Sequence, residues 1–307
     1  MDANTVRLII NKGVRSRALY RIMLERLTEP LHLNLAAAFV AAFGGFRSKV
    51  AFDLVYKQPY AWGILQAADQ AKDYGHKSVT VVEAGVAAGA GLMSMARIAE
   101  RAARITGVDI RVVGLDGGTG MPPPQDYRDH PDLYLAGDYP MDEAALRKAL
   151  PPHCSLLVGP LKEMVARLLA QLEGPIGFLA ADLDYFSSTL TVLDLFTSEP
   201  DRYLMAPMIY FDDVCYKQHN MWCGELGAIN EFNRAHEFRK IDRHRFLRSD
   251  RVFKNARWID QIYIMHPLDH PWRQKPYRAW SQRVLGNYFL SGNVARDKLI
   301  LPDKLAH

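Results

Sequence analysis

The chain has 307 residues and a mass of 34.7 kDa, enough for about two domains or for one large α/β domain with additions. Hydrophobic residues make up 49% of it and charged residues 23%, which excludes whole-chain disorder and fibrous or collagen-like classes. A formal net charge of +4 is too small to indicate a nucleic-acid-binding protein. Three cysteines, an odd and sparse set, fit a reducing compartment better than a disulfide framework.

Neither a membrane span nor a signal peptide is predicted. The longest apolar run covers residues 35–46, whereas the hydrocarbon core of a bilayer requires about 20 apolar residues. Near the N-terminus, Arg7, Lys12 and Arg15 interrupt or follow a short apolar patch, unlike the layout of a signal peptide. We therefore expect a cytoplasmic enzyme or binding protein whose partners include neither nucleic acid nor a membrane.

The first 75 residues predict a helical N-terminal cap. Helix-forming residues cover 17–27 and 33–46. A third stretch, 60–74, begins after Pro59 and ends before Gly75, the usual placement of these two residues at helix ends.

From residue 78 onward, short apolar segments alternate with amphipathic helices. The clearest helix covers 161–172, where apolar residues recur along one stripe. Such alternation predicts a doubly wound, mostly parallel, Rossmann-like α/β sheet, to which two later strands could add an antiparallel edge. The predicted strands of the parallel part are 78–83, 111–116, 155–159, 176–182 and 208–213. The two later strand candidates and the other helices of this region are 240–247 and 258–266, and 92–105, 143–150, 189–196 and 225–236.

Four of the five parallel strands end in acidic residues. In a doubly wound sheet the ligand binds at the carboxyl ends of the strands, near the point where the strand order reverses. We therefore expect the functional site at this edge. The acidic residues in question are Glu83, Asp116, Asp182 and the pair Asp212-Asp213.

A glycine-rich turn follows the first strand and opens a helix. Its sequence from Glu83 has the spacing G-x-x-x-G-x-G, which differs from the G-x-G-x-x-G dinucleotide motif. The turn resembles motif I of class I S-adenosylmethionine (SAM)-dependent methyltransferases, in which the loop lies against the methionine part of the cofactor. This resemblance implies that Glu83, Gly85, Gly89 and Gly91 bind the cofactor. The alternative is a tight Ala-rich turn that binds nothing.

Asp116 ends the second strand, where an acidic residue can accept hydrogen bonds from both hydroxyls of a cofactor ribose. The alternative is a helix N-cap or a solvated loop residue. The loop that follows, 117–142, contains Tyr127, Tyr134 and Tyr139 and exceeds ordinary connection lengths. Its length favours a lid or a binding role.

The ends of the fourth and fifth strands carry Asp182, Asp184, Asp212 and Asp213. Carboxylates on neighbouring strand ends repel one another and raise one another's pKa unless a cation neutralises them. Oxygen-only ligands favour a hard ion such as Mg²⁺. The alternative is that these residues cap helices and bind no metal.

The same residues resemble the macrocin O-methyltransferase family, metal-dependent sugar O-methyltransferases, over roughly residues 78–235. The family pattern D-x-D-x-Y-x-S-T is matched at Asp182, Asp184, Ser188 and Thr189, with Phe186 in place of the Tyr. A later strand of the family ends in D-D, as it does here. The resemblance implies that Asp182, Asp212 and Asp213 are metal ligands and that Asp184 is the catalytic general base.

These expectations together describe a SAM-dependent, Mg²⁺-assisted O-methyltransferase that acts on a hydroxyl of a small polyhydroxylated molecule, either a sugar or a secondary metabolite. Asp184 would accept the proton of an acceptor hydroxyl whose pKa the cation lowers. The alternatives are a non-catalytic binding protein with the same fold and a nucleotide-dependent oxidoreductase. The expected division is a cap over 1–75, a SAM-binding domain over 76–266 and an extension over 267–307. The sequence leaves a homo-oligomer open.

Overall fold

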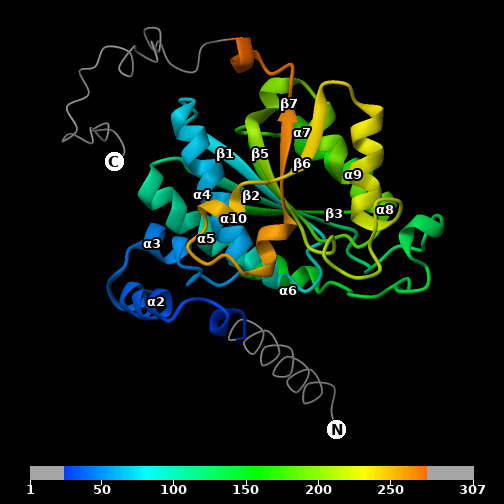
Figure 1. The fold of residues 1–307 in the computed structure, drawn as a ribbon. Helices are drawn as coiled ribbons and strands as arrows, with labels where there is room; N and C mark the ends of the chain where they lie inside the picture. Colours follow the sequence, from blue (N-terminus) through cyan, green and yellow to red (C-terminus); the bar gives the residue numbers. More distant parts are fainter. Residues whose placement is uncertain (1–23, 275–307) are drawn as a thin grey trace, which may run out of the picture. The chain divides into compact units, whose positions relative to one another are not determined.

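The computed structural model describes residues 24–274 (Figure 1). The chain forms two compact units, Met1–His270 and Pro271–His307. Of the second unit only the short 3₁₀ helix Pro271–Gln274 lies within the described residues. Most of the predicted helix 17–27 and nearly all of the predicted extension lie outside them, and the predicted domain boundaries stay predictions.

Seven strands form a single sheet in the order β3-β2-β1-β4-β5-β7-β6. Strands β1 to β5 pair in parallel, and β7 pairs antiparallel with both β5 and β6. The predicted doubly wound, mostly parallel sheet with an antiparallel edge is confirmed. The strands are β1 (Ser78–Ala84), β2 (Asp109–Asp116), β3 (Cys154–Val158), β4 (Ile176–Ala181), β5 (Tyr203–Phe211), β6 (Arg239–Arg243) and β7 (Ile262–Pro267).

Helices cover both faces of this sheet (Figure 1). On one face α4 packs on β1, β4 and β5, and α5 packs on β2 and on α4. On the other face α7 packs on β2 and β3, α9 packs on β6, and α8 lies against both of these helices. The helices are α2 (Leu31–Phe43), α3 (Phe46–Ala51), α4 (Gln58–Asp73), α5 (Ala90–Thr106), α6 (Glu143–Ala149), α7 (Leu161–Ala170), α8 (Phe186–Leu193), α9 (Gly224–Ala235) and α10 (Leu247–Asp250).

Each face of the sheet has its own hydrophobic core, because successive residues of a strand point to opposite faces. In β1, Val79 and Val81 belong to the cluster that includes α4 and α5 residues. Val82 and Ala84 belong to the cluster that includes residues of α7, α8 and α9. Burial on both faces explains why the strands are apolar almost throughout.

The predicted boundaries at the antiparallel edge were wrong. The strand expected over 240–247 ends at Arg243, and the strand expected over 258–266 begins only at Ile262. The residues before Ile262 form a 3₁₀ helix in which Trp258 is buried. An apolar run of this length does not distinguish a strand from a buried helical turn.

Helix α2 begins two residues before the Ala-rich stretch predicted as helical over 33–46 and ends at Phe43, and it contains no charged residue. Leu31, Leu35, Phe39 and Phe43 on this helix are exposed. Within residues 24–274, no helix is both long enough and apolar enough to cross a membrane.

Candidate active site

A cavity of about 570 Å³ lies at the carboxyl ends of the parallel strands, and we call it the rim cavity. Its walls come from the segments that follow the five parallel strands, β1 to β5. Because β1 lies between β2 and β4, this is the position at which the strand order reverses. Six of the predicted site residues line the cavity: Gly85, Asp116, Asp182, Asp184, Asp212 and Asp213.

Two glycines of the turn after β1 are required by close approaches. Gly85 has a φ of 86°, and a Cβ atom there would lie 1.8 Å from the carbonyl oxygen of Asp182. A Cβ atom on Gly91 would lie 1.9 Å from Oε1 of Glu83. Gly85 therefore lets the ends of β1 and β4 meet at the cavity wall, and Gly91 makes room for a buried carboxyl group.

Glu83 lies beneath the glycine turn rather than in the wall of the cavity. Its side chain is 2% exposed and accepts a hydrogen bond of 2.7 Å from the hydroxyl of Tyr60. Burial raises the pKa of Glu83 to about 7, although the Tyr60 hydrogen bond opposes this shift. Glu83, Gly89 and Gly91 do not line the rim cavity, so contact of these residues with a cofactor stays a prediction.

The Asp116 carboxylate connects the turn after β1 to the loop after β2. Its Oδ2 accepts hydrogen bonds from the backbone N–H groups of Val86 and Ala87, both at 2.8 Å. Its Oδ1 accepts a third from Gly118 at 2.6 Å. A carboxylate has about four acceptor positions, so three bonds fix its orientation and leave about one for a ligand. The predicted contact with ribose hydroxyls stays a prediction.

Three carboxylates form a compact group, which we call the acid cluster: Asp182, Asp184 and Asp213. One oxygen from each lies within 4.8 Å of the others. Asp184 has a φ of 58°, a conformation that costs a non-glycine residue about 1–3 kcal/mol and persists where the surroundings impose it. The structure thus brings together two of the predicted metal ligands and the predicted general base.

The acid cluster contains charges that the chain itself does not pair. Burial raises the pKa of Asp182 well above its usual range, and Asp212 raises it further. Burial, followed by Glu225, raises the pKa of Asp213 in the same direction. Within residues 24–274, no Lys or Arg forms an ion pair with the acid cluster or with Glu225.

Glu225, at the start of α9, contacts the backbone of the acid cluster residue Asp213. It is fully buried, and its Oε2 accepts a hydrogen bond of 2.9 Å from the backbone N–H of Asp213. Oε1 of Glu225 and Oδ2 of Asp213 are both buried without a hydrogen-bond partner among the described residues. Unpaired buried oxygens of this kind are costly unless a ligand satisfies them.

Asp212 lies beside the acid cluster and has partners of its own. Its carboxylate accepts a hydrogen bond from the Tyr210 hydroxyl, and its backbone carbonyl accepts one from the Gln261 amide. Asp212 is not a member of the compact group of three carboxylates. It lines the rim cavity, and its role as a metal ligand stays a prediction.

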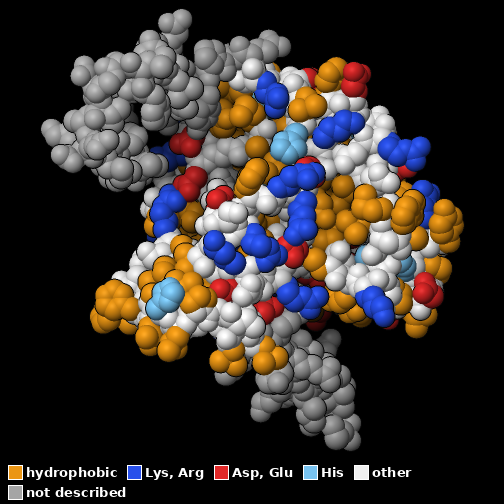
Figure 2. Space-filling model, in the orientation of Figure 1, with side chains coloured by type: hydrophobic (Ala, Val, Ile, Leu, Met, Phe, Trp, Pro, Cys, Tyr) orange, Lys and Arg blue, Asp and Glu red, His pale blue; other side chains and the backbone are white. Residues whose placement is uncertain are grey.

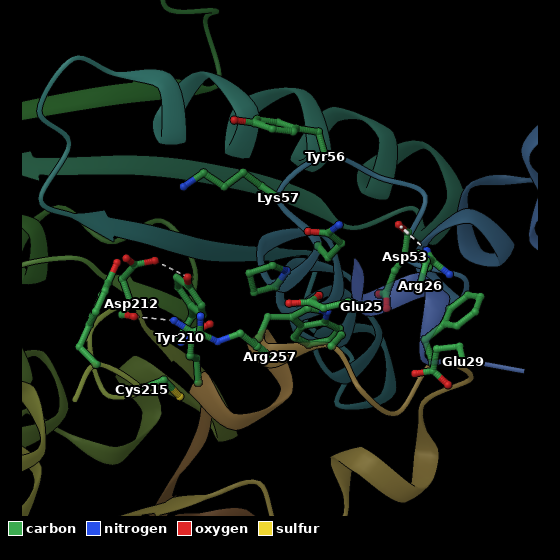
Figure 3. A pocket seen from close by; sticks show the side chains of 17 residues that line it. Glu25, Arg26, Glu29, Asp53, Tyr56, Lys57, Tyr210, Asp212, Cys215 and Arg257 are labelled. Atoms are coloured by element: carbon green, nitrogen blue, oxygen red, sulfur yellow. Dashed lines mark hydrogen bonds between the residues drawn. The ribbon is translucent and has the colours of Figure 1, made fainter. Parts of the chain in front are cut away.

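A second, smaller cavity of about 290 Å³ adjoins the first (Figure 3). Its walls come from residues 25–29 and 53–59 and from residues 253–261, which are far apart in the sequence. Asp212 and Tyr216 line both cavities. We call this space the side pocket. Sequence reasoning did not find it, because no local pattern links these distant segments.

Backbone strain is concentrated around the two cavities. Within residues 24–274, six residues other than glycine have a positive φ. Strained residues of this kind tend to cluster at functional sites. Five of the six line one of the cavities: Asp53 and Lys57 in the side pocket, and Ala87, Tyr139 and Asp184 in the rim cavity.

The long loop 117–142 is anchored next to the acid cluster. Asp129, which is fully buried, accepts hydrogen bonds from the backbone N–H of Ser187 at 2.8 Å and from its hydroxyl at 2.9 Å. Helix α8 therefore begins at Phe186 rather than at 189 as predicted, because a carboxylate from another segment satisfies its N-terminus. Tyr139 of the same loop lines the rim cavity.

No family model and no curated protein matches the chain. Three solved structures to which it is similar are methyltransferases by name. The calicheamicin methyltransferase CalS11 is 23% identical with a TM-score of 0.39, over 56% of this chain and 69% of that one. The O-methyltransferase NovP is 19% identical with a TM-score of 0.42, over 58% and 72%. The O-methyltransferase from Bacillus cereus, in complex with SAH, is 14% identical with a TM-score of 0.38, over 81% and 96%. At these TM-scores the activity has to be argued from the chain's own residues.

Proposed function

We propose that this chain transfers a methyl group from SAM to a hydroxyl oxygen of a small polyhydroxylated molecule, a sugar or a secondary metabolite, with the help of a divalent cation such as Mg²⁺. One observation carries this proposal. A single cavity lies where the strand order of the sheet reverses. The glycine turn, which is hydrogen-bonded to Asp116, bounds it on one side, and the acid cluster bounds it on the other.

The glycine-turn side of the rim cavity suits a nucleoside-like donor. Gly85 lines the cavity with backbone atoms only, because it has no side chain. The Asp116 carboxylate, which accepts three backbone hydrogen bonds, retains about one acceptor position. A volume of about 570 Å³ is within the usual range for sites that bind small molecules. The nearby carboxylates would favour a sulfonium cation before the reaction, and this attraction would weaken once the charge is lost.

The acid cluster fits a hard divalent cation. Its donor set consists only of carboxylate oxygens, and Oδ2 of Asp213 is buried without a partner among the described residues. Asp182 and Asp213 would hold the ion, with Asp212 beside them. A bound Mg²⁺ supplies positive charge that lowers the pKa of an acceptor hydroxyl.

The chain's own contribution is placement and proton removal. Asp184 is the residue that we propose accepts the acceptor's proton, since it lies in the cavity wall within the acid cluster. The strained φ of Asp184 holds its carboxylate in one place instead of leaving it on a mobile loop. Alignment of donor and acceptor can contribute about 7–11 kcal/mol to lowering the barrier.

The test has two stages. Calorimetric titration with SAM and with SAH measures the donor site, and we expect binding that a Gly85→Val variant loses. Transfer of a labelled methyl group from SAM to a panel of sugars and polyphenols, with Mg²⁺ or with EDTA, then measures the reaction. We expect transfer that requires the cation and that Asp184→Asn abolishes while SAM still binds.

The other interpretations predict different results. SAM binding without transfer to any member of the panel would favour a non-catalytic binding protein. Thermal stabilisation by NAD(P) but not by SAM would favour a nucleotide-dependent oxidoreductase and would contradict the proposal.

A further inference from the structure

The side pocket has an unusual distribution of charge, and we propose that it holds the methyl acceptor and selects one that carries an anionic group, phosphate or carboxylate, in addition to its hydroxyls. This inference rests on the proposed function, because it names the class of acceptor for that reaction. It depends on the position of the pocket, on two cations in its wall and on its aromatic surface.

The position of the side pocket suits an acceptor. Asp212 and Tyr216 belong to the walls of both cavities, so a molecule in the side pocket lies next to the acid cluster. A donor in the rim cavity and an acceptor in the side pocket would therefore meet at the strand ends. With about 290 Å³, the side pocket has room for a molecule of roughly monosaccharide size.

Most charged groups at the end of the side pocket away from Asp212 have partners within the protein. Asp53 forms a buried ion pair with Arg251 at 2.6 Å. Arg26 donates to the carbonyl groups of Phe52 and Asp53 at 2.6 and 3.1 Å. Glu29 accepts a hydrogen bond from the backbone of Asn255.

Two cations in the wall differ from these groups. Within residues 24–274, the side chains of Lys57 and Arg257 form neither an ion pair nor a hydrogen bond, and Lys57 has only a cation–π contact with the Tyr60 ring at 4.9 Å. In Figure 3 both side chains extend toward the end of the pocket where Asp212 and Tyr210 lie. Of the four carboxylates in the wall, Glu25, Glu29 and Asp53 have partners. Two unpaired cations beside the fourth, Asp212, therefore leave room for an anionic ligand group.

Lys57 occupies its place because of a strained backbone. Its φ of 57° and ψ of 61° are left-handed, immediately before α4 begins at Gln58. The helix start fixes the direction in which the side chain leaves the backbone. Burial and then Asp212 raise the pKa of Asp182, and the ammonium group of Lys57 opposes this rise, so Lys57 acts on the acid cluster and on the pocket from one position.

The remaining wall of the side pocket offers flat apolar surface. Tyr56, Tyr210, Phe253 and Trp258 contribute to the lining. Aromatic faces pack against the C–H face of a sugar or against an aromatic ring. Cations at one end and aromatic side chains along the wall together favour a ring that carries an anionic substituent.

The outer surface near Arg257 also favours an anionic acceptor. Residues 239–257 contain eight Lys and Arg residues. Arg251 is buried against Asp53, and four others form ion pairs with Asp242, Asp260 or Asp269. Among the described residues, Lys240, Lys254 and Arg257 form no ion pair, so the segment keeps an excess of positive charge. Figure 2 shows Lys and Arg side chains gathered near the centre of the face that carries β6 and α10. A positive field of this kind raises the local concentration of anions and their rate of arrival.

The experiment compares three probes that share one ring: glucose, glucuronate and glucose 6-phosphate. The protein is first saturated with SAH and Mg²⁺, and that binding is measured by itself. Titrations followed by saturation-transfer NMR then give the affinity for each probe. We expect glucose to bind at least about tenfold more weakly than one of the anionic probes, as loss of one charged hydrogen bond predicts. The comparison of glucuronate with glucose 6-phosphate identifies the preferred anion.

Three variants assign this preference to the side pocket. Arg257→Gln and Lys57→Gln should each reduce the preference for the anionic probe by about tenfold, and Arg257→Lys should retain part of it. Arg234→Gln, which removes an exposed cation on α9, is the matched control and should leave the preference unchanged.

Several outcomes would overturn the inference. They are equal affinity for all three probes, no binding of either anionic probe, or a preference that survives in both Gln variants. If Lys57→Gln weakens only Mg²⁺ binding and Arg257→Gln has no effect, Lys57 merely compensates the acid cluster, and the inference is wrong. Failure of SAH to bind would contradict the proposed function instead, and the probe titrations without SAH would still decide the anion preference.

Discussion

The buried carboxylate of Asp53 and the partly buried acid cluster differ in whether the chain supplies a cation for them. Asp53 is 8% exposed and lies against Arg251 at 2.6 Å, with Arg26 nearby. The acid cluster of Asp182, Asp184 and Asp213 has no ion-pair partner among the described residues. Both regions pay the same kind of desolvation cost, but only the first contains the cation that offsets it.

The difference separates a structural carboxylate from a candidate functional one. Burial raises the pKa of Asp53 to about 6, and Arg251 and Arg26 oppose the shift. For Asp213, burial, Glu225 and Asp184 all act in the direction that raises the pKa. Proteins commonly retain such destabilising carboxylates at sites where a bound ligand compensates their negative charge.

The largest effect is expected from Arg251→Met, which leaves Asp53 buried without its cation. Breaking a buried ion pair on one side costs about 3–5 kcal/mol of the free energy of unfolding. The loss should be larger at pH 8 than at pH 5. The folded pKa of Asp53 is already raised to about 6 and rises further without Arg251, so stability falls as the pH increases through that range.

Urea unfolding at the two pH values measures this effect. The matched control is Arg248→Met, because Arg248 forms an exposed ion pair with Asp260 and should lose less than about 1 kcal/mol. Equal losses for the two variants would mean that Arg251 does not neutralise Asp53.

The second effect is on cation binding. Asp182→Ala and Asp213→Ala should each weaken Mg²⁺ binding beyond the roughly 10–100-fold that loss of a supporting residue costs, and methyl transfer should be lost with it. Calorimetry with Mg²⁺, or with Mn²⁺ followed by paramagnetic resonance, measures the affinity. Circular dichroism shows whether the fold survives.

The exposed residue Asp201 supplies the control for cation binding, since it precedes the start of β5 whereas Asp213 follows the end of that strand. Full activity and unchanged Mg²⁺ affinity in both cluster variants would contradict the hypothesis that the acid cluster binds Mg²⁺.

The third effect has the opposite sign. Asp213→Asn keeps the shape of the side chain but removes the carboxyl group whose pKa is raised by burial, Glu225 and Asp184. The cost of that raised pKa disappears, so the protein without a cation should become more stable by about 1 kcal/mol at neutral pH. Thermal unfolding in EDTA and in Mg²⁺ checks this. Mg²⁺ should raise the Tm of the original protein but not that of the variant. A variant that is less stable in EDTA would indicate that the Asp213 charge is paired after all.

The sheet and the acid cluster could be predicted because both depend on local patterns. Apolar segments that end in acidic residues identify parallel strands and the edge at which their carboxyl groups meet. Asp182, Asp184 and Asp213 do lie together, as their positions after β4 and β5 indicate. Such reasoning needs only the order of the elements.

Features that depend on contacts between distant segments could not be predicted. The side pocket joins residues 25–59 to residues 253–261, and nothing in either segment indicates the other. Lys57 is placed by a left-handed backbone, which a lysine rarely adopts and which no propensity predicts. Asp116 was predicted as a cofactor ligand, but its bonds to three backbone N–H groups became visible only in the structure.

The smallest effect concerns two buried histidines, whose rings stack with centroids 4.8 Å apart. Burial, followed by His130, lowers the pKa of His219 to about 4. Because this folded pKa lies below the ordinary value, stability should be lost as the pH falls from about 6.5 toward 4. One titrating group changes the free energy of unfolding by at most about 1.4 kcal/mol per pH unit, so His219→Phe should recover about 1 kcal/mol or less between pH 6 and pH 5. Unfolding in urea at these two pH values, with exposed His32→Phe as the control, measures the difference. A histidine that burial and a neighbouring histidine keep neutral loses stability in acid, whereas a buried carboxylate without a cation loses it in base. An unchanged pH profile in His219→Phe would therefore show that these surroundings do not set the charge state of His219.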